Sequence, residues 1–203
     1  MADTPEIGLD LAPWRSPLAR ALHRNRALPN ARYLQLATLR PNGYPANRTV
    51  VFRGFWGTTN QLQIVTDARS AKAEDIRHCA HGEACWYFPK TREQFRLGGT
   101  LTLVGQDAPT PQSTPYQIAR KTAWQALSDG ARSQFMWPAP GAPRATEGFT
   151  PDRPDPTVPP EHFCLLLLEP MHVDHLELRG DPQNRWVYQW EAATGWQQQA
   201  VNP

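Results

Sequence analysis

The stretch Thr66–Lys72, with the sequence TDARSAK, concentrates groups that bind oxyanions. It holds two hydroxyl side chains, Thr66 and Ser70, and two cationic side chains, Arg69 and Lys72. The residues LQIV before it predict a strand, and AEDIR after it predicts a helix. A strand that leads into a helix start presents unpaired backbone N–H groups, and the helix dipole adds partial positive charge. Because a cation in the first turn opposes that dipole, Lys72 is easier to explain if an anion binds there.

A plainer interpretation stays open for this stretch alone, in which Ser70 or Asp67 caps the helix and the two cations are solvated. A second basic segment favours the oxyanion site. The segment RTVVFR begins with Arg48 and ends with Arg53, and a guanidinium suits bidentate contact with phosphate. Residues five apart on a regular strand point to opposite faces. One of these arginines can therefore contact a phosphate, and the other is left for a ring or a substrate.

The elements that must position these groups are mostly β-strands. Alternating apolar residues and turn signals predict strands over 33–39, 48–53, 62–66, 84–88, 94–97, 100–104, 163–168, 173–178, 185–190 and 196–201. Helices are predicted over 17–25, 70–78 and 116–127. The first three strands are expected to form a meander, with strand 48–53 beside the strand that ends at Thr66. Antiparallel strands with a few inserted helices predict a mainly β fold, a barrel or sandwich with α decoration.

Length and composition narrow the class of protein. The 203 residues predict a single domain over 1–203, and eight prolines between 138 and 160 predict a long loop inside it, because strands resume afterwards. A net charge of +2 provides no long-range field for nucleic acid. The N-terminus lacks the features of a signal peptide, and the longest apolar run is too short to span a bilayer. We therefore expect a cytoplasmic protein that binds neither nucleic acid nor membrane.

Other chemistries have less support in the sequence. The three cysteines lack CxxC spacing, which argues against a disulfide framework and a cysteine-based zinc site. The pairs His78-x-x-His81 and His172-x-x-His175 have no convincing further ligand, so we expect solvated or capping histidines and no metal site. The segment 128–133 holds serines and an aspartate without a partnered histidine, so a hydrolase triad is unsupported.

Three segments, RTVVFR, IVTDARSAK and CWYFPKTREQFRLGG, occur in an order that resembles the flavin-binding split-barrel family of pyridoxamine 5'-phosphate oxidase. The resemblance is greatest to the oxidase-related branch. It covers about residues 32–104, with a weaker echo in DPQNRWVYQW near the C-terminus. It implies a six-stranded antiparallel split barrel that binds flavin mononucleotide (FMN) at the subunit interface of a homodimer.

The same resemblance implies which residues contact the cofactor. Arg48 is expected toward the phosphate and Arg53 near the flavin ring or the substrate. Arg69 is expected to replace a basic residue that the oxidases carry where this chain has Ala71. The expected FMN contacts are Arg48, Thr49, Val50, Val51, Arg53, Val65, Thr66, Arg69, Ser70, Lys72, Gln94 and Arg185.

The resemblance predicts an FMN-dependent oxidoreductase of a small substrate, in which the flavin carries the chemistry and no acid–base residue is assigned. The oxidases have an Arg-x-His element before their last arginine, where this chain has Pro182-Gln183-Asn184 before Arg185. The cofactor site is therefore matched better than the substrate site, and the sequence alone does not establish oxidation of pyridoxamine phosphate. The alternative is a non-catalytic split-barrel protein that binds or senses flavin or heme.

Overall fold

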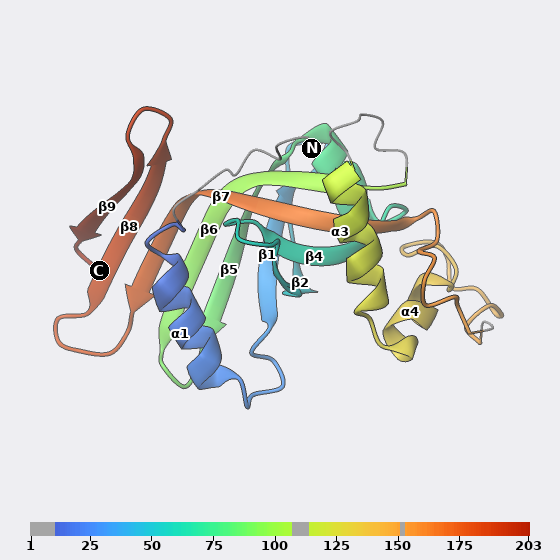
Figure 1. Ribbon diagram of the computed structural model, residues 1–203, viewed down its shortest axis with the longest axis horizontal. Coiled ribbons are helices and arrows are strands. Elements are labelled where there is room, and N and C mark those ends of the chain that lie inside the picture. Colours follow the sequence, from blue (N-terminus) through green and yellow to red (C-terminus); the bar gives the residue numbers. More distant parts are fainter. Residues whose placement is uncertain (1–10, 107–113, 151–152) are drawn as a thin grey trace, which may run out of the picture.

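All strand pairs in the sheet are antiparallel, as the closely spaced turns predict. The computed structural model describes residues 11–106, 114–150 and 153–203. The strands are β1 (Tyr33–Leu39), β2 (Pro45–Val51), β3 (Gly54–Phe55), β4 (Leu62–Asp67), β5 (His81–Phe88), β6 (Glu93–Val104), β7 (Phe163–Glu177), β8 (Asn184–Glu191) and β9 (Gly195–Val201). The helices are α1 (Arg15–Asn25), α2 (Ala71–His78), α3 (Thr114–Gln125) and α4 (Asp129–Phe135). Figure 1 shows the hairpin β8–β9 at one end of the molecule and α3 and α4 at the other.

The strand order corrects the expected meander. It runs β2-β1-β5-β6-β7-β4-β3. Strand β2 lies at one end of this order and β4 lies next to the other end, so the two strands do not pair. Because twisted sheets coil, the two ends approach one another. The Arg53 amide donates to the Gln63 carbonyl at 2.8 Å, and Gly54 then pairs with Gln63. Six strands, β2, β1, β5, β6, β7 and β4, thus form the split barrel that the sequence predicts, and β8–β9 extends from β7.

Two long strands replace four of the predicted ones. Strand β6 covers both 94–97 and 100–104, and β7 covers both 163–168 and most of 173–178. A β-bulge between Gly98 and Gly99 shifts the register of β6 against β7. A Cβ atom on Gly99 would overlap the Glu169 carbonyl oxygen, so glycine permits this close approach of two backbones.

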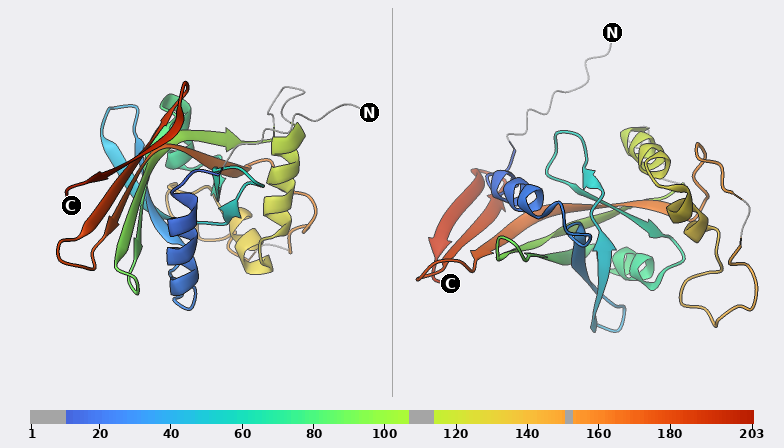
Figure 2. Two further views of the ribbon diagram at one scale, coloured as in Figure 1. Left: turned by 60° about the vertical axis from the view of Figure 1, so that its left-hand side comes forward. Right: turned by 90° about the horizontal axis from the view of Figure 1, so that it is seen from below.

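The hydrophobic core has two parts, which explains the continuous apolar run FCLLLL at the start of β7. Leu166 and Leu168 point into the barrel, whereas Leu165 and Leu167 pack on the opposite face with α3. A strand covered on both faces loses its polar alternation. Helix α1 lies against the barrel (Figure 2) and buries Leu18 there.

The helices largely follow the prediction. Helix α2 begins after Ser70, as expected, and α3 begins and ends about two residues before the predicted range. Helix α4 was not predicted, because seven mainly polar residues are too few to show helical periodicity. The described residues of 138–160 contain neither helix nor strand, in agreement with the expected loop. Among the described residues, no helix has the length and apolar character to cross a membrane.

Candidate functional site

The end of β4 and the start of α2 hold the hydroxyl groups of the TDARSAK stretch. Ser70 is the N-cap of α2: its Oγ accepts a hydrogen bond from the Ala73 amide at 3.4 Å and donates one to the Asp67 carbonyl at 2.7 Å. The buried Thr66 hydroxyl lies 3.4 Å from the same Oγ. Ser70 therefore caps the helix, as the plainer interpretation proposed, and keeps its hydroxyl beside the free N–H groups of the first turn.

Lys72 is the cation of this stretch that has no counter-ion. It is half-buried and makes no hydrogen bond or ion pair with any other residue in the described part of the chain. The pKa of Lys72 is lowered to about 8. Burial is the larger cause and repulsion from Arg48 the second, and the attraction of Asp67 is too small to offset them. A desolvated ammonium without a carboxylate partner is typical of a site that receives an anion.

Arg48 reaches the same region from inside the barrel. Its guanidinium donates to the Leu36 carbonyl at 3.3 Å and pairs with the Asp75 carboxylate of α2 at 3.0 Å. Asp75 is 3% exposed and also accepts a hydrogen bond from the Thr38 hydroxyl at 2.7 Å. This network attaches α2 to β1 and β2. It also fixes the Arg48 guanidinium close enough to Lys72 to perturb its charge.

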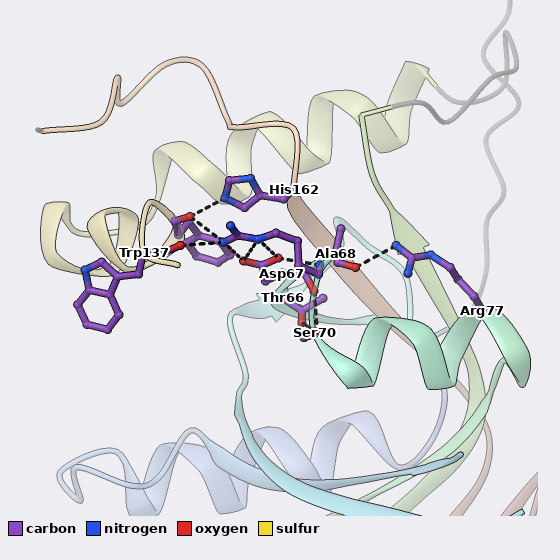
Figure 3. Close-up of polar contacts among 9 residues, drawn as sticks. Thr66, Asp67, Ala68, Ser70, Arg77, Trp137 and His162 are labelled. Carbon is purple, nitrogen blue, oxygen red and sulfur yellow. Dashed lines mark hydrogen bonds and ion pairs between the residues drawn. The ribbon is translucent and has the colours of Figure 1, made fainter. Parts of the chain in front are cut away.

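Arg69 is held by neighbours on both sides. Its Nε and Nη2 lie 3.0 and 2.6 Å from the Asp67 carboxylate, and this contact raises the pKa of Arg69. Nη2 also donates to the carbonyl oxygens of Phe135 and Trp137, at 3.2 Å each (Figure 3). His162 contacts the same Phe135 carbonyl. Arg69 thus ties the TDARSAK stretch to the segment that follows α4.

Substituting Arg69 with alanine is expected to loosen the proline-rich loop without unfolding the barrel. The partly exposed ion pair contributes roughly 0.2–1 kcal/mol, so the melting temperature should change little. Chymotrypsin should cleave after Phe149 several times faster, because the carbonyl contacts of Arg69 with Phe135 and Trp137 are lost. Arg77→Ala is the control, because Arg77 donates to the Ala68 carbonyl at 3.2 Å, on the other side of the stretch. Equal cleavage of Arg69→Ala and wild type would contradict the role of Arg69 as a tie.

A cavity of about 480 Å³ lies between the TDARSAK stretch and the proline-rich loop. One wall is formed by the polar stretch, and the other is apolar and aromatic. The lining includes Thr66, Asp67, Arg69, Ser70, Lys72, Gln134, Phe135, Trp137, residues 138–145 and Phe149. Gln134, Arg144 and Phe149 were not predicted as site residues, because they lie in segments without periodicity. The proline-rich composition was the one available signal.

The remaining predicted contacts of β2 and β4 do not line this cavity. Val50 is buried inside the barrel, whereas Thr49 is exposed and Val51 half-buried on the outer face. Val65 is half-buried and packs toward α3. Arg53 lines a different cavity, of about 540 Å³, and burial and the nearby Arg32 lower its pKa. The structure therefore separates Arg53 from Arg48, as the strand geometry predicts.

Gln94 and Arg185 lie at the opposite end of the sheet. Both pair with Leu176, near the end of β7, whereas Thr66 pairs with Cys164 at its start. At ~3.3 Å per residue, roughly 40 Å of strand separates the two groups. One chain therefore does not bring all twelve predicted residues together.

The buried carboxylate of Asp174 fixes two arginines at this second group. Arg185 Nη2 lies 2.7 Å from Asp174, and Arg96 pairs with the same oxygen. Burial acts to raise the pKa of Asp174, but hydrogen bonds from Arg185 and Arg96 outweigh it and lower the pKa. Two arginines thus share the carboxylate of Asp174.

The histidines differ from the sequence expectation at one position. His175 is 1% exposed, so it is neither solvated nor a cap. Its ring stacks on Phe95 with a centroid distance of 4.0 Å, and its Nε2 lies 2.9 Å from the Glu93 carboxylate. Glu177 lies nearby, so these three residues place possible metal ligands within 4.8 Å of one another. His172 does not join this group. Residues three apart on a strand point to opposite faces of the sheet, and His172 contacts Gln189.

Comparisons with known proteins agree with this fold. The sequence model described as pyridoxamine 5'-phosphate oxidase, FMN-binding domain, matches residues 11–105. Pyridoxine/pyridoxamine 5'-phosphate oxidase 2 of Arabidopsis thaliana is 41% identical over 204 residues, covering 97% of this chain and 100% of its own. The crystal structure of a pyridoxamine 5'-phosphate oxidase-related, FMN-binding protein of Nostoc punctiforme is 57% identical. It covers 96% of this chain and 100% of its own, with a TM-score of 0.91.

A more distant structure, PhzG of Burkholderia lata, shares the fold with a TM-score of 0.74 at 15% identity. Fold and sequence together define the class, an FMN-binding split-barrel protein. Within that class, the chain belongs to the pyridoxamine 5'-phosphate oxidase-related family, and its cofactor is FMN. The donors at the start of α2 suit a phosphate-bearing cofactor, because a cation, hydroxyl groups and free backbone N–H groups lie beside a cavity.

Proposed function

We propose that this protein is an FMN-dependent oxidoreductase that acts on a small substrate. The observation that carries the proposal is the unpaired, partly desolvated Lys72 at the start of α2, beside a cavity of about 480 Å³. A cavity of this size accommodates a small ligand. Bound FMN supplies a ring that accepts a hydride or two electrons.

The side chains of this chain then have distinct tasks. Lys72, Ser70 and the free N–H groups of α2 hold the phosphate, and Arg48 adds a second positive charge whose position Asp75 fixes. Thr66 contributes a hydroxyl beside Ser70. The aromatic wall of the proline-rich loop limits the access of water to the cavity. No side chain is required as a proton donor in this proposal.

A homodimer with FMN at its interface is part of the proposal. It is supported by the separation between Lys72 and the pair Gln94 and Arg185, which a second copy of the chain would overcome by supplying the latter. The outer face that carries Val51 and Gln94 also exposes Tyr33 and Tyr87, at 47% and 45%. Such exposed aromatic residues are enriched at interfaces. Light scattering of the purified protein tests this, and a monomer that retains FMN would contradict it.

The activity is tested by mixing the FMN-loaded protein anaerobically with candidate reductants and following the flavin absorbance. Pyridoxine and pyridoxamine 5'-phosphate are the first to try, because the Arabidopsis relative is named for them. Reduced nicotinamides come next. Loss of the flavin absorbance and its return with oxygen would support an oxidoreductase. Bound flavin that none of these compounds reduces would favour a protein that stores or senses flavin.

The affinity for FMN is expected to fall about tenfold between pH 7 and pH 9. The free Lys72 ammonium, with a pKa of about 8, loses its proton over this range, whereas a bound phosphate keeps it protonated. The phosphate is already dianionic above about pH 6, so its own titration does not contribute. Fluorescence titration of apoprotein with FMN measures the effect. Lys72→Arg should flatten the profile, and an equally flat profile for wild type would contradict the assignment.

A further inference from the structure

A separate cavity of about 400 Å³ lies away from all the residues assigned to FMN. It is formed by the turn before β4, the start of α3, the middle of β7 and the hairpin β8–β9. Four of its lining residues are aromatic: Trp56, Tyr116, Trp190 and Trp196. The function proposed above makes no use of this cavity.

The aromatic residues form two pairs. Trp56 and Tyr116 stack with a centroid distance of 4.7 Å and an interplanar angle of 29°. Trp190 and Trp196 are cross-strand partners in the β8–β9 hairpin, with centroids 5.9 Å apart and ring planes tilted by 56°. Aromatic faces attract cations through the ring quadrupole, most strongly for tryptophan. Indole and phenol rings also provide apolar contact area for the body of a ligand.

The polar groups of the cavity favour a cation that can donate a hydrogen bond. Glu169 is the only charged side chain among the described residues of the lining. Gln61 Nε2 donates to Glu169 Oε2 at 2.9 Å. Because an ionised carboxylate only accepts hydrogen bonds, this contact fixes which end of the Gln61 amide faces Glu169. Gln61 Oε1 is enclosed by protein and is not accessible from the cavity. The exposed carboxylate of Glu169 is therefore the charged acceptor that a ligand in the cavity can reach.

We infer that this cavity binds an organic ammonium ion, a primary or secondary amine on a small apolar body. Its N–H group donates to the Glu169 carboxylate, which also balances its charge, and its apolar body contacts the two aromatic pairs. An anion is disfavoured by the carboxylate. A neutral ligand gains less from the aromatic faces, and a quaternary ammonium has no N–H group to donate to the Glu169 carboxylate.

Calorimetry on the FMN-loaded protein with three probes tests the inference. Benzylamine carries both a charge and N–H donors, benzyltrimethylammonium has the charge alone, and benzyl alcohol has a donor without charge. We expect benzylamine to bind at least about tenfold more tightly than either of the others. Equal affinity for all three would mean a merely apolar cavity, and no binding of benzylamine would overturn the inference directly.

Two matched variants link the binding to this cavity. Glu169→Gln should weaken benzylamine about tenfold and leave benzyl alcohol unchanged, while the FMN content confirms that the variant is folded. Glu83→Gln removes the same charge from an exposed position on β5 that does not line the cavity, and should have no effect. If both variants weaken benzylamine equally, or if neither does, the amine does not bind at Glu169.

Discussion

Replacing Lys72 with methionine is expected to abolish tight binding of FMN and, at the same time, to stabilise the FMN-free protein. A charge-assisted hydrogen bond to phosphate contributes ~1.5–3 kcal/mol, so its loss should raise the Kd about 10- to 150-fold. The other cations near Lys72 have contacts of their own, because Arg69 is paired with Asp67 and Arg48 with Asp75, and Arg144, which lines the same cavity, lies over the Phe149 ring. We therefore expect none of them to replace the lost charge in full.

The stabilising effect follows from the lowered pKa. In the folded protein Lys72 titrates near pH 8 in place of its ordinary value of 10.5. Below pH 8 the folded state therefore carries this charge at a cost, and the unfolded state does not. The pKa difference sets a ceiling of roughly 3 kcal/mol. Since solvent still reaches part of the side chain, we expect about 1 kcal/mol, or 2–4 °C in melting temperature.

The pH dependence of stability has a definite sign. Between pH 8 and 10.5 the unfolded state binds more protons at this residue than the folded state, so its contribution to wild-type stability rises with pH. Lys72→Met should lack this rise. Lys121→Met, at an exposed position on α3, is the control for removing a lysine charge. Fluorescence titration with FMN and thermal melts of the apoprotein measure both effects. Unchanged FMN affinity in Lys72→Met would remove the basis of the proposed phosphate site.

Substituting Gly99 with alanine is expected to be among the most destabilising single-methyl additions in the barrel. The new Cβ would overlap the Glu169 carbonyl oxygen and lie 2.8 Å from the carbonyl carbon. Both atoms belong to the backbone of β7, which cannot rotate away as a side chain can. Overpacking against backbone costs roughly 3 kcal/mol or more, equivalent to a loss of at least about 6 °C in melting temperature.

Gly98 provides a matched control one residue away. The Cβ atom of an alanine at this position would lie 3.7 Å from the Glu83 carboxylate and 3.9 Å from the His172 carbonyl oxygen. These are ordinary contacts, so Gly98→Ala should change stability by less than about 1 kcal/mol. Denaturant unfolding of the two variants compares them under the same conditions. Equal stabilities would mean that β6 and β7 do not approach as closely at the bulge as the structure indicates.

The sequence by itself determined the local features of this protein. Period-two alternation located the strands, and turn residues located most of their ends. The TDARSAK stretch identified the start of α2, because a hydroxyl at the N-cap and free N–H groups behind it are properties of neighbouring residues. The family, the barrel class and the FMN cofactor followed from three ordered segments, and the comparisons confirm them.

Only the tertiary structure decided how these local features meet. A hydrophobic period of two predicts a strand but does not specify which strand it pairs with. In this protein β2 approaches β4 because the curled sheet closes into a barrel, and not because the two strands follow one another in a meander. Whether a cation is free also depends on distant neighbours: Asp67 and Asp75 pair with Arg69 and Arg48 and leave Lys72 alone. The burial of a side chain and its ion pairs depend on the whole fold. The lowered pKa of Lys72 therefore could not be predicted from its local sequence.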